Sequence, residues 1–313
     1  MNGCARLIVR LLVLCYRVRI RHDPRTGLDV GAWIDEDLVD IVIAGGGFIA
    51  FETPIDEFVK KAEGTGVQIY GCLEALRPTV DELTMRAIAA RYWEQGIAGL
   101  YLFNYYNMPQ EWKRDTLGRL IDRDALARLD KRYEFDKRGR VRSTSQLGFS
   151  FQNAIPSTQL PTALQKTVVG PSTLLKVNIA DDLEGAKANR TLGECTVGLR
   201  LEDMGNGDVI EVSINGAQLP SPGGRGTEGG GSGASTPRMS TDGWTRDDYV
   251  RAPSQYPKQI TTNTDPGTVI EWTVDTPPLK KGVNEIGVRL AETDENREEE
   301  LILADMRVWV RYK

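Results

Sequence analysis

The strongest constraint on the fold is a change of hydrophobic period near Arg142. Before it, nearly continuous apolar runs alternate with segments of helical period, and after it apolar and polar residues alternate with a period of two. The first pattern is typical of parallel strands covered on both faces by helices. The second is typical of antiparallel strands with one buried face. We therefore predict two domains, over residues 1–142 and 143–313.

Short apolar runs predict four strands in the first domain, and segments of helical period lie between them. One predicted helix begins near Pro54, another begins at the capping box Thr79–Glu82, and helical patterning over Leu117–Tyr133 closes the region. The predicted strands are Leu11–Val18, Val39–Ala44, Val67–Tyr70 and Gly99–Phe103.

Strict alternation marks the second domain as an antiparallel jelly roll or β-sandwich. Ile210, Val212 and Ile214 alternate with polar residues, and Asn215-Gly216 is a strong hairpin-turn signal. Residues 220–236 are nearly all Gly, Ser, Pro and Thr, so we predict a disordered loop there. Further strands are predicted over Leu174–Ile179, Cys195–Leu201, Val269–Val274, Asn284–Leu290 and Leu301–Tyr312.

Composition excludes several classes of function. The net charge of -5 and the pI of about 5.3 argue against a nucleic-acid partner. The chain has one histidine, and its four cysteines are far apart, so we predict no metal site and no disulfide framework. The Gly45-Gly46-Gly47 run lacks a following G-K-[ST], which favours a tight turn and no nucleotide cofactor.

The N-terminal segment is apolar but short. Arg10 interrupts the run Leu7–Tyr16, which is too short to span a bilayer and lacks the unbroken core of a signal peptide. We therefore predict no membrane partner. Localisation stays open, because a degraded signal sequence would look similar.

Three N-terminal segments carry a family resemblance. They are Gly27–Ile41, Gly66–Gly71 followed by Glu74, and Gly96–Asn104 with the pattern G-x-x-G-x-x-x-F-N. Over roughly the first 135 residues, the chain resembles strands 5 to 8 of bacterial glycoside-hydrolase-like (β/α)8 barrels. The later run Leu279–Ile286 resembles the galactose-binding-like jelly rolls that are appended to such enzymes.

The resemblance implies a partial barrel. A complete barrel needs about 200 residues or more, whereas residues 1–142 hold about four βα units, and strands 1 to 4 are missing. The acid/base carboxylate that often follows strand 4 is missing with them. The expected fold class is therefore α/β plus all-β: a partial TIM-type barrel followed by a jelly roll. Such a half barrel predicts a homodimer or a partner chain that completes it, or a truncated start, which would also have removed an export signal.

Two carboxylates are the candidate catalytic residues that this resemblance implies. Glu74 lies just past the strand that ends at Tyr70-Gly71, and its role would be nucleophile or base. Glu52 lies in the loop after the strand that ends at Ala44. The alternative for Glu74 is a glutamate that flanks a helix or forms a salt bridge. The alternative for Glu52 is a solvated loop carboxylate near a helix N-terminus, where negative charge is favoured.

Four further residues are candidates for substrate binding. Asn104 and Tyr105 follow the last strand, where an amide could bond a sugar hydroxyl and a ring could stack on a sugar face. Trp33 is a candidate platform, and His22 follows the first strand. Packing at the barrel rim is the alternative for Asn104 and Tyr105, helix or loop packing is the alternative for Trp33, and solvation is the alternative for His22.

The leading hypothesis is a glycoside-hydrolase-like protein that acts on or binds carbohydrate. The alternative is a non-catalytic carbohydrate-binding or structural surface module, and a third hypothesis is a truncated product without activity. Whether the chain is an enzyme stays open, because fold-level resemblance does not fix function.

Overall fold

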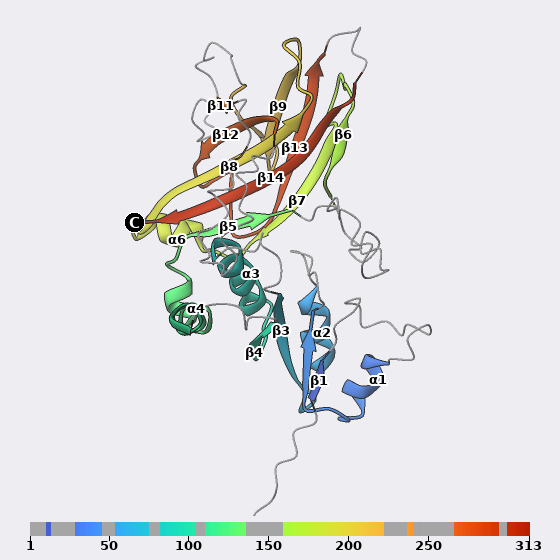
Figure 1. Ribbon diagram of the computed structural model, residues 1–313, viewed down its shortest axis with the longest axis vertical. Coiled ribbons are helices and arrows are strands. Elements are labelled where there is room, and N and C mark those ends of the chain that lie inside the picture. Colours follow the sequence, from blue (N-terminus) through green and yellow to red (C-terminus); the bar gives the residue numbers. More distant parts are fainter. Residues whose placement is uncertain are drawn as a thin grey trace, which may run out of the picture. The chain divides into compact units, whose positions relative to one another are not determined.

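The computed structural model describes ten parts of the chain, and they are mostly β (Figure 1). Strands make up 44% and helices 23%, arranged as three sheets and six helices within these parts. The chain divides into two compact units, Met1–Pro78 with Tyr92–Tyr106 and Thr79–Arg91 with Asn107–Lys313. The described residues are 11–13, 29–45, 54–74, 82–103, 110–135, 159–221, 237–240, 244, 266–293 and 299–313.

The first unit contains a four-stranded parallel sheet in the order β1-β2-β3-β4. Its strands are β1 (Leu11–Val13), β2 (Ile41–Ala44), β3 (Gln68–Glu74) and β4 (Gly99–Phe103). Three helices lie between successive strands along the chain: α1 (Val30–Asp35), α2 (Ile55–Ala62) and α3 (Glu82–Glu94). The division between the two units falls inside α3.

Local chemistry explains these helices. The Asp29 carboxylate caps α1 by accepting a hydrogen bond from the Ala32 N–H at 3.0 Å. In α2, Ile55, Phe58 and Ala62 share one buried face, because residues three and four apart lie on the same side of a helix. Acidic residues in its first turn and lysines in its last turn complement the helix dipole.

The partial TIM-type barrel predicted from the sequence is wrong as a fold class. The described chain is predominantly β, and its largest sheet belongs to the antiparallel second unit. The parallel sheet ends at β1 and β4, which do not pair with each other in the described residues. Among the described residues, the parallel sheet has four strands of at most seven residues each, whereas the two antiparallel sheets contain the ten strands β5 to β14.

The second unit contains two antiparallel sheets. The smaller has the order β10-β9-β13-β7, with β7 (Thr173–Ile179), β9 (Val209–Ile214), β10 (Ala217–Gln218) and β13 (Gly282–Glu292). The larger has the order β11-β12-β8-β14-β5, with β6 (Thr162–Leu164) also pairing with β14. Its other strands are β5 (Lys131–Glu134), β8 (Leu192–Glu202), β11 (Arg238–Ser240), β12 (Thr268–Val274) and β14 (Leu301–Tyr312). The helices of this unit, besides most of α3, are α4 (Gln110–Ile121), α5 (Arg123–Leu126) and α6 (Leu183–Ala188).

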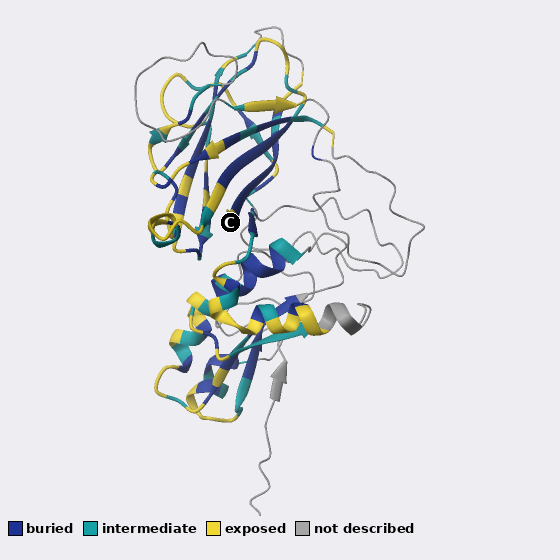
Figure 2. Cartoon of the chain, turned by 90° about the vertical axis from the view of Figure 1, so that its left-hand side faces the viewer, coloured by how far each residue is buried: buried dark blue, intermediate teal, exposed yellow. Residues whose placement is uncertain are grey.

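Alternating apolar side chains supply the core of the second unit. Ile210, Val212 and Ile214 are all buried, as the period of two predicts. Asn215 and Gly216 have φ values of 50° and 84°, and they connect β9 to β10, so the predicted hairpin is confirmed. Buried residues concentrate along the strands of these sheets (Figure 2).

The end of the predicted Leu117–Tyr133 helix is wrong. After α4 and α5, the chain forms β5, whose residue Tyr133 pairs with Val308 of β14. The burial of Lys131, Arg132 and Tyr133 against β14 overrides the helical period that Leu126, Leu129 and Tyr133 suggest. The predicted domain boundary at residue 142 stays a prediction, because residues 136–158 lie outside the described parts.

Candidate functional site

The sequence-predicted site is only partly described. Glu74 is the last residue of β3, and its Cα pairs with Phe103, the last residue of β4. Trp33 lies in α1, where it is half-buried and its backbone N–H donates to the Asp29 carbonyl oxygen at 3.1 Å. The side chain of Glu74 and the residues Glu52, Asn104, Tyr105 and His22 lie outside the described parts, so the predicted constellation stays a prediction.

Sequence reasoning missed a row of charged side chains on one face of the larger antiparallel sheet. In β14, Asp305, Arg307 and Trp309 point to the same face, because alternate residues of a strand do so. Arg307 pairs with Gly198 of β8 on one side and with Glu134 of β5 on the other. We call this the charged face: Arg132, Glu134, Arg200, Glu202, Glu271, Asp305, Arg307 and Trp309.

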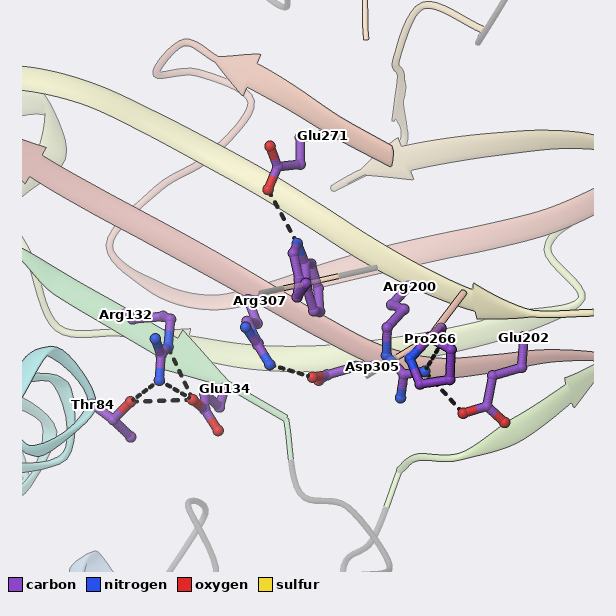
Figure 3. Close-up of polar contacts among 10 residues, drawn as sticks. Thr84, Arg132, Glu134, Arg200, Glu202, Pro266, Glu271, Asp305 and Arg307 are labelled. Atoms are coloured by element: carbon purple, nitrogen blue, oxygen red, sulfur yellow. Dashed lines mark hydrogen bonds and ion pairs between the residues drawn. The ribbon is translucent and has the colours of Figure 1, made fainter. Parts of the chain in front are cut away.

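Arg307 is at the centre of the charged face, and its side chain is 0% exposed (Figure 3). Its Nη2 donates to Asp305 Oδ2 at 2.9 Å, and its guanidinium carbon lies 4.0 Å from the centroid of the Trp244 ring. The Trp244 indole N–H donates to Glu271 Oε1 at 3.2 Å. Trp244 therefore supports Arg307 through a cation–π contact while a carboxylate satisfies its own polar atom.

A glycine makes room for this arrangement. Trp244 and Trp309 meet edge to face, with ring centroids 5.7 Å apart. A Cβ atom on Gly198 would lie 2.9 Å from the Trp244 ring and 3.0 Å from the Trp309 ring. Position 198 therefore has to be glycine for both indoles to pack on the sheet.

Two further arginines flank the centre (Figure 3). Arg132 donates from Nε and Nη2 to Glu134 Oε1, at 3.0 and 2.7 Å, and Nη2 also donates to the Thr84 hydroxyl of α3 at 3.0 Å. On β8, the Nη1 of Arg200 donates to Glu202 Oε1 at 2.9 Å and to the Pro266 carbonyl oxygen at 2.7 Å.

The three arginines of the charged face are each neutralised by a carboxylate. Arg132, Arg200 and Arg307 are all buried, and each one bonds a carboxylate two residues away on its own strand. Buried charges are tolerated in proteins when they are paired and hydrogen-bonded in this way. Because its arginines are paired and buried, the charged face is suited to hold strands together and poorly suited to meet a ligand.

The outward face of the smaller sheet has similar residue types in an accessible setting. Lys176 of β7 pairs with Glu285 of β13 at 3.1 Å, with exposed fractions of 61% and 49%. Arg289 of β13 pairs with Glu211 of β9 at 3.4 Å, and the exposed fractions of these side chains are 29% and 31%. We call this the open face: Lys176, Glu211, Ser213, Glu285, Gly287 and Arg289.

Glycine and serine separate the two ion pairs of the open face. Gly287 pairs in register with Ser213, and a Cβ atom on Gly287 would lie 2.7 Å from the Ser213 Oγ. Pro171 also packs beside Gly287, and Leu174, which is 51% exposed, pairs with Gly287 from β7, so the middle of the face has small and apolar side chains. Gln159 protects the edge of β7 by bonding both the N–H and the carbonyl oxygen of Lys176, at 2.7 and 2.9 Å.

The sequence carried a signal for both faces. In β14 the alternation Asp305-x-Arg307-x-Trp309 marks one side of the strand as charged, and in β13 Glu285 and Arg289 do the same. This period of two predicts the strands and the polar side of each. It does not predict which residues pair across strands or how deeply they are buried.

Comparisons with known proteins give no match. No protein-family model matches the chain, and no curated protein matches it. Among the described residues, no helix has the length and apolar composition to cross a membrane. Within the same ranges, no three His, Cys, Asp or Glu residues group in a way that could hold a metal ion.

Proposed function

We propose that this chain is a non-catalytic carbohydrate-binding protein that contacts sugar through the open face. The observation that carries the proposal is the presence of two partly exposed ion pairs, Lys176–Glu285 and Arg289–Glu211, on either side of the Gly287–Ser213 position. They come from three adjacent strands, so the sheet fixes their spacing.

The chemistry of these groups suits a polyhydroxylated ligand. Each sugar hydroxyl is both a donor and an acceptor, so it can bond a carboxylate and a cation of the same pair at once. Gly287 places no side chain of its own between the two ion pairs, and Pro171 packs beside it. Because the groups are already held by each other, little side-chain entropy is lost on binding.

Binding without hydrolysis follows from the same geometry. Hydrolysis of a glycosidic bond requires one carboxyl group kept protonated and another kept ionised on opposite sides of the bond. On the open face, Glu211 and Glu285 are each held in an ion pair, and their side chains are 31% and 49% exposed. Both carboxylates lie on the same face of one sheet, where they can accept hydrogen bonds from hydroxyl groups but do not lie on opposite sides of a bound sugar.

The test is a glycan panel with the full chain, followed by calorimetry on any glycan that binds. We expect the double variant Glu211→Ala/Glu285→Ala to weaken binding by about tenfold or more. The matched control is Glu194→Ala, which breaks the Arg311–Glu194 pair of the larger sheet, where the exposed fractions are 51% and 46%. A panel without binding, or equal weakening by both variants, would overturn the proposal.

A second candidate function is hydrolysis of glycosidic bonds, favoured by the position of Glu74 at the carboxyl end of β3. In α/β sheets, ligands bind at the carboxyl ends of parallel strands. If the chain hydrolyses a glycoside, Glu74→Gln should reduce the rate by about 100-fold or more. Glu57→Gln, at an exposed position of α2, is the control. Unchanged turnover in Glu74→Gln would remove Glu74 from the mechanism.

A further inference from the structure

A second group of polar side chains lies inside the second unit, away from both faces described above. It contains Lys131 and Tyr133 of β5, Asp181 just after β7, and Tyr312 of β14. The exposed fractions of the Lys131 and Asp181 side chains are 0% and 1%. Neither the proposed sugar contacts nor the charged face uses this group.

Asp181 is the centre of this buried group. Its Oδ1 accepts from Lys131 Nζ at 2.7 Å and from the Tyr312 hydroxyl at 2.7 Å. Its Oδ2 accepts from the Tyr133 hydroxyl at 2.5 Å. Lys131 Nζ also donates to the Leu129 carbonyl oxygen at 2.9 Å, so the ammonium is held in place on the carboxylate.

Burial changes the acid–base behaviour of these groups. It lowers the pKa of Lys131, although the negative charge of Asp181 acts in the opposite direction. It raises the pKa values of Tyr133 and Tyr312, and the charge of Asp181 raises both further. Both hydroxyls therefore keep their protons and remain donors to Asp181. The neutral amine form of Lys131 costs less free energy to form here than in water.

We propose that Lys131 and Asp181 form an isopeptide bond, in which Lys131 Nζ is joined to Asp181 Cγ and one water is released. A fixed amine beside a fixed carboxyl group, excluded from water, meets the requirements for an intramolecular condensation. Exclusion of water also opposes the reverse reaction, which is hydrolysis of the amide. The proposal is independent of sugar binding.

The atoms of the reaction balance without a co-reactant. One proton moves from the Lys131 ammonium to Asp181 Oδ1, which leaves a neutral amine beside a neutral carboxyl group. The Nζ lone pair then bonds to Cγ. The bond from Cγ to Oδ1 breaks, and Oδ1 takes a second proton from Nζ and leaves as water.

The two tyrosines have distinct roles in this scheme. Oδ2 becomes the amide carbonyl oxygen, and the Tyr133 hydroxyl that already donates to it would stabilise its negative charge in the tetrahedral intermediate. The Tyr312 hydroxyl donates to Oδ1 and would support the departing oxygen.

The bond would join the edges of the two antiparallel sheets. β5 is the edge strand of the larger sheet, and Asp181 follows β7, the edge strand of the smaller one. The two residues are 50 positions apart in the sequence. A covalent bond there would prevent the sheets from separating at this edge.

The first test is the intact mass of the denatured full chain. We expect wild type to be lighter than its sequence mass by one water, and Lys131→Arg to have its full sequence mass. The matched control is Lys187→Arg, because Lys187 also lies near an aspartate, Asp275, at 3.6 Å, but both side chains are about half exposed or more. The control should keep the loss of one water.

The second test is a peptide map of wild type, which does not depend on the folding of any variant. We expect the peptide that contains Lys131 to be covalently attached to the peptide that contains Asp181. A wild-type mass equal to the sequence mass would overturn the proposal. So would a loss of water that persists in Lys131→Arg, because an internal succinimide at another aspartate would behave in that way.

Discussion

The charged face and the open face use the same residue types in opposite settings. Both are faces of antiparallel sheets on which arginine lies close to glutamate or aspartate. The partners are two residues apart on one strand of the charged face and lie on neighbouring strands of the open face. On the charged face Arg307 is 0% exposed, whereas on the open face the four paired side chains are 29–61% exposed. The same chemistry is therefore sequestered in one sheet and accessible in the other.

This difference decides what each face can do. Removing one partner of a buried ion pair leaves a charge away from water and costs about 3–5 kcal/mol, whereas an exposed pair contributes about 0–1 kcal/mol. The charged face is therefore part of the folded framework. The open face contributes little to stability, so substitutions there should leave the fold intact.

Arg307→Met should give the largest loss of stability. It leaves Asp305 in the interior without the guanidinium at 2.9 Å, and it removes the contact with Trp244. We expect the free energy of unfolding in urea to fall by about 3 kcal/mol or more. Arg289→Met on the open face is the control and should cost less than about 1 kcal/mol. Similar losses in the two variants would contradict the contrast between the faces.

The pH dependence of stability tests the interior that the two sheets share. Burial, and secondly the charge of Asp181, raise the pKa of the Cys195 thiol from 9.0 to about 12. The fold thus favours the neutral thiol, so this contribution is complete below pH 9 and is lost as pH rises toward 12. Between about pH 8 and about pH 10.5, wild type should lose about 2 kcal/mol more stability than Cys195→Ala. Parallel pH profiles for the two proteins would show that the thiol is not shielded.

Gly198→Ala and Gly287→Ala compare how the two faces tolerate one added methyl group. The added Cβ would meet two indole rings at 2.9 and 3.0 Å, so we expect a loss of about 1–2 kcal/mol in the free energy of unfolding. Gly287→Ala on the open face would meet the Ser213 Oγ, which can rotate away, so its loss should be smaller. Intrinsic tryptophan fluorescence should change only in Gly198→Ala. A larger loss for Gly287→Ala would reverse this expectation.

The smallest effect is expected for the Lys176–Glu285 pair. A double-mutant cycle with Lys176→Met and Glu285→Gln should give a coupling of about 0–1 kcal/mol, and added salt should reduce it. Chemical denaturation at low and high salt measures both quantities. A coupling of several kcal/mol that does not respond to salt would mean that this pair behaves like the buried ones.

Local features of the antiparallel unit were predictable from the sequence. The alternation over Ile210–Ile214 and the Asn215-Gly216 turn specify a strand and a tight reversal within a few residues, and both are confirmed. The order of the strands in the sheet was not predictable from the sequence, since β8 pairs with β12 and β14, which are distant from it in the sequence. Pairings of this kind depend on loop closure and on the fit of whole faces.

The incorrect predictions share a physical cause. The helical period over Leu117–Tyr133 is real, but Tyr133 gains a buried position against Val308 of β14, which a local pattern cannot anticipate. Four strands with intervening helices suggested a barrel, although the closure of a barrel depends on strand number and stagger. Of the candidate site, the sequence pattern predicted a strand that ends at Tyr70 with Glu74 beyond it, whereas β3 extends to Glu74.

The sequence by itself determined which side of each strand is polar, where the β9–β10 turn lies, and which residue types are available for binding. Only the tertiary structure decided that Arg307 is buried while Arg289 remains open, and that Lys131 meets Asp181. The reason is that periodicity follows from backbone geometry, which acts between neighbours. Burial and charge pairing depend on segments that are distant in the sequence and meet only in the folded chain.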